Sequence, residues 1–116
     1  MESEEFGAEV GLREGSPVIA MRGTATRAAQ PGLEAAYVEA ARHPGEILLD
    51  FSDVEYINST GIAVIVGVLA TARAEGRTLG ATGLTDHYRE VFQITRLSDF
   101  MHIYEDAPSG AERRGQ

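Results

Sequence analysis

Four residues at a predicted strand-to-helix junction could do chemistry: Asn58, Ser59, Thr60 and Gly61 stand just before the apolar run IAVIVGVLATA. If a helix begins near Ser59, the side chain of Asn58 or Ser59 can accept a hydrogen bond from a free N–H group of the first turn. Gly61 has no side chain and would leave these amides open to solvent. The same N–H groups and the positive end of the helix dipole also favour an anion. The junction therefore fits a plain helix cap, and it also fits a phosphate on Ser59, which would add about −1.5 to −2 charge.

The segments around this junction predict an α/β fold. Weak alternation at residues 6–12 and an apolar run at 17–21, with a turn at 14–16 between them, indicate a hairpin. The other predicted elements are, in order, a helix at 33–41, a strand at 47–51, a helix from 59 to 75–76, a strand at 78–82, a helix from 85–86 to 94 and a strand at 101–104. In a chain of 116 residues this order favours one domain, with helices packed on a mixed sheet of four to five strands.

The helix that follows Ser59 is apolar on every side. The stripe predicted to face the sheet repeats at helical spacing and consists of Ile62, Ile65, Val66, Leu69 and Ala72. The opposite side carries small or apolar groups where a solvated face would carry Lys and Glu, namely Ala63, Val64, Gly67, Val68 and Thr71. A chain this short has little material to cover both sides. We therefore expect a docking surface whose partner-binding residues are Val64, Gly67, Val68 and Thr71.

Composition and charge exclude several classes of function. The absence of cysteine excludes disulfides and thiolate metal sites. The net charge of −8 argues against nucleic acid, and it fits either a basic patch on a protein partner or solubility alone. No segment near the N-terminus resembles a signal peptide, and the apolar run at 62–72 is shorter than the roughly 20 residues that span a bilayer. We therefore expect a cytoplasmic protein that does not enter the membrane.

Enzymatic chemistry finds little support in the sequence. Ser59 lacks the first glycine of a G-x-S-x-G nucleophile elbow. The three histidines, His43, His87 and His102, are scattered without the spacing of metal ligands. We therefore expect no metal, no cofactor and no catalytic residue.

A family resemblance extends over nearly the whole chain. The stretch DFSDVEYINSTGIAVIVGVLATARAEGRTL resembles the signature of STAS domains, specifically of bacterial anti-sigma-factor antagonists, which place a D-S-[ST]-G turn between an apolar strand and an apolar helix. Downstream, VFQITRL at 91–97 resembles the LF-x-ITGL segment of that family. The resemblance implies a STAS-type fold for residues 1–106. The remaining residues, 107–116, are polar and are expected to form a disordered tail.

The resemblance also implies a function. In that family the anti-sigma factor is a serine protein kinase that phosphorylates the first hydroxyl of the turn, which is Ser59 here. The unphosphorylated antagonist binds the anti-sigma factor and releases a sigma factor for transcription. Phosphorylation breaks the complex, and a serine phosphatase restores it. The implied protein is a binding module and not an enzyme, a monomer or weak dimer, with Asn58, Thr60, Gly61 and Thr26 around the phosphorylation site.

Two departures from the family pattern leave alternatives open. The family usually has Asp before the serine, where this chain has Asn58, and an acidic residue in a turn where this chain reads GTAT at 23–26. Asn58 keeps the hydrogen-bonding capacity of Asp but loses its charge. The alternatives are a non-switching STAS scaffold subunit of a stress-signalling or lipid-transport complex, and a small hydrolase that uses Ser59.

Overall fold

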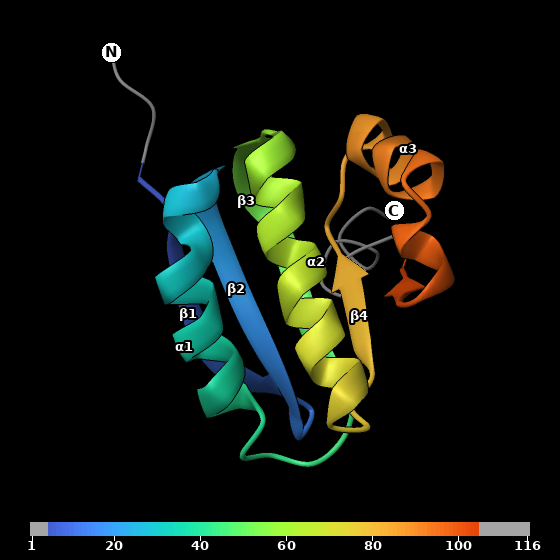
Figure 1. Cartoon of the computed structure of the whole chain (residues 1–116). Coiled ribbons are helices and arrows are strands. Elements are labelled where there is room, and N and C mark those ends of the chain that lie inside the picture. Colours follow the sequence, from blue (N-terminus) through green and yellow to red (C-terminus); the bar gives the residue numbers. More distant parts are fainter. Residues whose placement is uncertain (1–4, 105–116) are drawn as a thin grey trace, which may run out of the picture.

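The computed structural model describes residues 5–104, which form a five-stranded mixed sheet with three α-helices (Figure 1). The sheet has the order β1-β2-β3-β4-β5; β1 and β2 are antiparallel and the other neighbours are parallel. The elements are β1 (Gly7–Arg13), β2 (Ser16–Ala25), the 3-10 helix η1 (Arg27–Ala29), α1 (Gln30–Ala40), β3 (Ile47–Ile57), α2 (Ser59–Ala74), β4 (Leu79–Thr82), α3 (Asp86–Ile94), the 3-10 helix η2 (Leu97–Asp99) and β5 (His102–Ile103). The predicted fold class and hairpin are confirmed. The tail predicted at 107–116 lies outside the described residues.

The hairpin closes through a two-residue turn. Glu14 and Gly15 both have positive φ, 55° and 87°, as a type I′ turn requires. The register runs without interruption from Arg13 opposite Ser16 to Gly7 opposite Arg22. This turn places β1 at one edge of the sheet.

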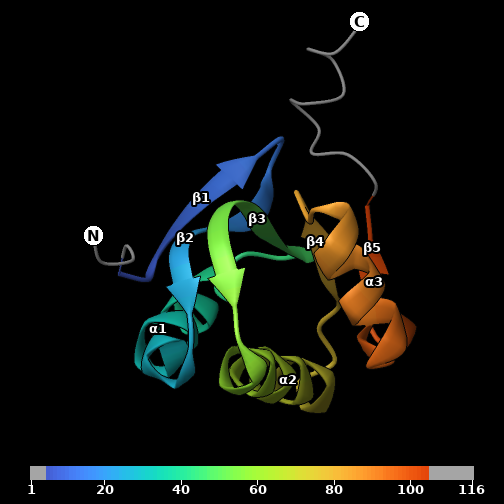
Figure 2. The same cartoon turned by 90° about the horizontal axis from the view of Figure 1, so that it is seen from above.

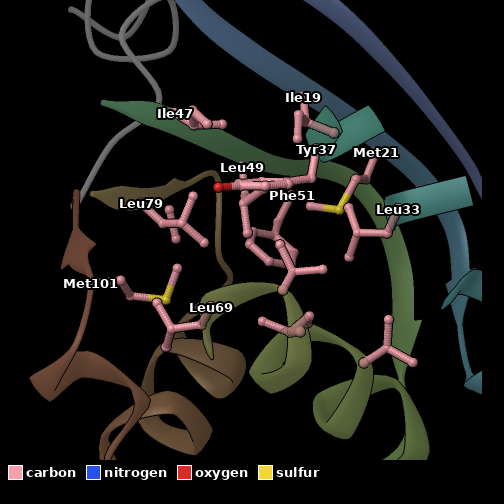
Figure 3. Close-up of a cluster of buried hydrophobic side chains, with 14 of the residues drawn as sticks. Ile19, Met21, Leu33, Tyr37, Ile47, Leu49, Phe51, Leu69, Leu79 and Met101 are labelled. Atoms are coloured by element: carbon pink, nitrogen blue, oxygen red, sulfur yellow. The ribbon is translucent and has the colours of Figure 1, made fainter. Parts of the chain in front are cut away.

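Helices α1 and α2 lie side by side on one face of the curved sheet, and α3 lies beside β4 and β5 (Figure 2). The core between α1, α2 and the sheet is aliphatic and aromatic (Figure 3), and its labelled members include Ile19, Leu33, Leu49, Phe51 and Leu69. Phe92 of α3 is fully buried and meets the Phe51 ring edge-on, with 5.6 Å between the ring centroids. Helix α3 is thereby anchored to the same core.

A polar contact joins the two helices of this layer. The Tyr37 hydroxyl in α1 donates to the Glu75 carboxylate at the end of α2, at 2.7 Å. The Tyr37 side chain is buried. Burial, together with the hydrogen bond to Glu75 and the negative charge of that carboxylate, raises the pKa of Tyr37 to about 12.

Strand β3 is longer than the sequence pattern predicts, because its second half extends past the end of β4 and carries polar side chains. Residues 48–50 pair with both β2 and β4, whereas the pairing beyond Asp50 continues with β2 alone. Polar side chains, including Ser52 and Glu55, are therefore exposed there, and the apolar pattern ends before the strand does. This extension carries the chain to Ile57, directly before the junction with α2.

Candidate functional site

The site lies where β2 and β3 end and α2 begins. Asn58 has an extended backbone (φ −96°, ψ −177°), and its side-chain oxygen accepts a hydrogen bond from the Gly61 N–H at 2.9 Å. The Asn58 N–H in turn donates to the carbonyl oxygen of Ala25 at the end of β2, at 3.2 Å. Of the two caps that the sequence allowed, Asn58 is the one that forms, and Ser59 is the first residue of the helix.

The other hydroxyl groups at the junction are engaged in structural hydrogen bonds. Thr60 donates to the Asn58 side-chain oxygen at 2.8 Å and accepts from the Arg27 N–H at 3.0 Å. Thr26 accepts from the Ala28 N–H at 3.1 Å and so caps η1. The bond between Arg27 and Thr60 ties the start of α2 to η1, a helix that the sequence pattern did not predict.

Ser59 differs from these neighbours. It is exposed, and within residues 5–104 its hydroxyl has no hydrogen-bond partner. Its position at the first turn of α2 places it in the positive end of the helix dipole. Ser59 is therefore the accessible hydroxyl of the junction.

Gly61 has a packing role that the sequence analysis missed. It is buried, and a Cβ atom at this position would overlap the carbonyl oxygen of Ala25 and lie 3.1 Å from the Ile57 side chain. The prediction that Gly61 leaves the first-turn amides open to solvent is wrong for its own N–H, which is bound to Asn58. Because Gly61 lies so close to Ala25, the start of α2 packs directly against the ends of β2 and β3.

The predicted orientation of α2 on the sheet is wrong. Val64 and Val68, predicted to face outward, are buried with only 8% and 3% of their surface exposed. Val66, predicted to face the sheet, is 44% exposed. The buried stripe is centred on the line that starts at Gly61, and it consists of Gly61, Val64, Ile65, Val68, Leu69 and Ala72. Because the helix is apolar all round, its sequence pattern does not determine which side faces the sheet.

The exposed side of α2 carries no charge between Ser59 and Arg73. Its exposed members, called the α2 surface below, are Ala63, Val66, Gly67, Ala70 and Thr71. Gly67 and Thr71 are exposed as predicted, whereas Val66 and Ala70 were missed as surface residues. Ser59, Ala63, Val66 and Ala70 follow one another at helical spacing, so Ser59 lies at the N-terminal end of this surface.

Two features border the α2 surface. A cavity of about 260 Å³ lies between the starts of α1 and α2, and its walls include Arg27, Glu34, Thr60 and Gly67. Near the other end, the guanidinium carbon of Arg73 lies 4.8 Å from the ring centroid of Phe100. An apolar surface with a polar rim is the arrangement found at protein–protein contacts.

The histidines do not form a second site. The His102 Nδ1 lies 2.6 Å from a carboxylate oxygen of Glu46, and His87 packs edge-on against Tyr88. Across residues 5–104, no group of three or more His, Cys, Asp or Glu side chains could hold a metal ion. Of the helices in the same range, none combines the length and apolarity that crossing a bilayer requires.

Residues 8–103 match the protein family described as "Mlab, STAS domain", and the chain therefore belongs to the STAS family. Over 60 residues it is 33% identical to the anti-sigma-B factor antagonist of Staphylococcus aureus (strain NCTC 8325 / PS 47), which covers 52% of this chain and 56% of that protein. Over 55 residues it is 38% identical to the anti-sigma-B factor antagonist of Listeria monocytogenes, covering 47% and 48%. The chain thus spans about half the length of these curated relatives.

Solved structures share the fold over more of the chain. An anti-sigma factor antagonist from Mycobacterium paratuberculosis superimposes with a TM-score of 0.69 at 21% identity, covering 94% of this chain and 93% of that one. The unphosphorylated form of the anti-sigma factor antagonist SpoIIAA superimposes with a TM-score of 0.64 at 18% identity, covering 95% and 96%. At these identities the similarity shows the fold alone.

Proposed function

We propose that this STAS domain is an anti-sigma-factor antagonist whose binding is switched by phosphorylation of Ser59. The observation that carries the proposal is the contrast at the junction: Thr60 and Asn58 are held in structural hydrogen bonds, whereas the Ser59 hydroxyl is exposed and unbonded within the described chain. The names of the two curated relatives support the antagonist role.

The α2 surface would contact the anti-sigma factor. It offers uncharged side chains that lose little hydration when a partner covers them, and Ser59 stands at its end. A phosphate on Ser59 would be tolerated in the free protein, because it lies in water beside the positive end of α2. In the complex that phosphate would have to be desolvated, which is far more costly than leaving it in water. The switch would thus act on binding and leave the fold intact.

The roles of the surrounding residues follow from their contacts. Asn58 would hold the turn so that the Ser59 side chain points into solvent. Gly61 would allow α2 to pack closely against the ends of β2 and β3. Thr60 and Thr26 would keep η1 in place beside the phosphorylation site. Under this proposal the chain acts without a cofactor, and catalysis belongs to its partners: a serine-kinase anti-sigma factor adds the phosphate and a serine phosphatase removes it.

The replacement of the family's Asp by Asn58 is compatible with this scheme. The oxygen of Asn58 accepts from both the Gly61 N–H and the Thr60 hydroxyl, and an amide oxygen does this as a carboxylate would. The lost charge would therefore affect the kinase reaction more than the geometry of the turn.

A second candidate is a STAS scaffold subunit without a switch. The uncharged Asn58 favours it, and so does the family description, which names Mlab. Such a protein would use the same α2 surface but would not be a kinase substrate.

Incubation with anti-sigma factors of its own host and ATP, read by intact mass and peptide mapping, tests the choice. The switch requires one added phosphate on Ser59 and none on the Ser59→Ala variant, while Thr60→Ala still accepts phosphate. Stable binding of a partner without any phosphate transfer supports the scaffold instead. Phosphate found only on Thr60 contradicts the role assigned to Ser59.

A further inference from the structure

Strand β1 forms an open edge of the sheet. It pairs with β2 on one side, and no described strand or helix lies beyond it (Figure 2). It is seven residues long, keeps an uninterrupted register with β2, and contains neither Pro nor Lys. An edge strand of this kind presents unpaired backbone groups to another strand; it has no bulge, although it carries two charged side chains, Glu9 and Arg13. The opposite edge, β5, has only two residues.

The turn determines which backbone groups point outward. In a hairpin closed by two residues, the pair that flanks the turn, here Arg13 and Ser16, exchanges backbone hydrogen bonds. The direction then alternates along the strand. The N–H and C=O groups of Ala8, Val10 and Leu12 therefore point away from β2, toward the open edge.

We infer that β1 pairs antiparallel with β1 of a second copy of this chain, about a two-fold axis at Gly11. This register places Val10 opposite Leu12 of the second copy, and both residues have outward-pointing backbone groups that can bond. It also places Glu9 opposite Arg13 of the second copy. Glu9 and Arg13 would occupy non-hydrogen-bonded positions, where side chains on facing strands come closest. The two-fold axis repeats each contact, as in the common isologous dimer.

The side chains suit this pairing. Glu9 is exposed, and its carboxylate has no partner within residues 5–104. Arg13 binds Asp50 through Nη2 at 3.2 Å, and its side chain is 34% exposed. Its Nη1 is a buried atom without a hydrogen-bond partner in the same part of the chain. Leu12 is 57% exposed and would lie against Val10 of the second copy. Gly11 has open space where a side chain would be, so two copies can approach there.

The neighbouring register explains these features less well. Centred on Val10, it would place Glu9 opposite Gly11 and Arg13 opposite Gly7, so neither charge would face its opposite. The Gly11-centred dimer does not depend on Ser59, and its failure would leave the proposed function unaffected.

Sedimentation velocity over a concentration series tests the dimer. We expect the wild-type chain to be a dimer at high concentration and a monomer on dilution. Glu9→Arg and Arg13→Glu should each weaken dimerisation at least tenfold, because each places like charges opposite one another. An equimolar mixture of the two variants should dimerise again, since opposite charges then face each other at both contacts.

Two further variants keep the test decisive. Glu90→Arg on α3 makes the same change in charge as Glu9→Arg, at an exposed position away from β1, and should leave dimerisation unchanged. Leu12→Lys should abolish the dimer without disturbing the Arg13–Asp50 pair. A wild-type chain that remains monomeric at the highest concentration overturns the inference. So does a dimer that tolerates both charge reversals, or a mixture of the two variants that fails to associate.

Discussion

The side-chain oxygen of Asn58 lies 2.8 Å from the Thr60 hydroxyl and 2.9 Å from the Gly61 nitrogen, and it accepts a hydrogen bond from each. One oxygen thus caps α2 and orients the threonine that reaches η1. Ser59, which lies between Asn58 and Thr60 in the chain, takes no part in this network.

The cap leads to a prediction about stability. Asn58→Ala removes the acceptor of both bonds and should lower the free energy of unfolding by about 0.5–2 kcal/mol. Asn58→Asp retains an oxygen acceptor, adds a negative charge near the helix N-terminus, and should be at least as stable as the wild type. Urea denaturation followed by circular dichroism measures both. An aspartate variant as unstable as the alanine variant would show that the amide group itself is required.

The two glycines of α2 provide a matched pair. Gly61→Ala places a methyl group against the carbonyl oxygen of Ala25 and should destabilise the fold by about 1–3 kcal/mol. Gly67→Ala meets open space on an exposed part of the helix and should stabilise it by about 0.5–1 kcal/mol. Thermal melts of the two variants distinguish them. Equal shifts in Tm would contradict the close approach of Gly61 to β2.

The corrected orientation of α2 is tested by two neighbouring valines. Val68→Asp buries an unpaired carboxylate in the core and should cost about 3 kcal/mol or more, enough to unfold much of the protein. Val66→Asp lies on the exposed side and should change stability by no more than about 0.5 kcal/mol. The same Val66→Asp variant should lose affinity for the partner. If the Val68→Asp protein folded and the Val66→Asp protein did not, the buried and exposed sides of α2 would be the reverse of those described.

Because the pKa of Tyr37 is raised in the folded chain, we expect the protein to lose stability in alkaline solution. The pKa of Tyr37 is about 12 in the folded chain, above the ordinary value of 10.0, so the unfolded chain releases this proton first as the pH rises. The stabilisation is therefore complete below pH 10 and is lost as the pH rises from about 10 to 12, by up to about 3 kcal/mol. Tyr37→Phe should flatten this part of the profile, measured by urea denaturation at several pH values. An unchanged profile would assign the alkaline loss to other groups.

Much of the fold could be predicted because its signals are local. The Glu14-Gly15 turn and the buried run at 47–51 are visible in short stretches of sequence. The Asn58 cap was one of two local options, and its geometry was needed to choose between them. The predicted length of β3 was wrong. Its second half is paired on one side only and carries polar residues, so the apolar pattern that indicates a strand ends too early.

The orientation of α2 required tertiary information. Every side of the helix is apolar, so periodicity alone favoured a stripe turned away from the true one. The contact between Gly61 and Ala25 determines the rotation, and these residues are distant in the chain. Similarly, η1 has a local cap in Thr26, but its contact with Thr60 of α2 has no local pattern in the sequence. A glycine inside the first turn of an apolar helix was the available signal for close packing.

A phosphate on Ser59 should disrupt partner binding without disturbing the fold. Calorimetric titration of the anti-sigma factor with the unmodified chain, with Ser59→Ala, and with phosphoserine incorporated at position 59 tests this expectation most directly. We expect the first two to bind alike and the phosphorylated chain to bind at least about 100-fold more weakly, a difference of about 2.7 kcal/mol, with its circular dichroism spectrum unchanged. Equal affinity of the phosphorylated and unmodified chains would contradict the account.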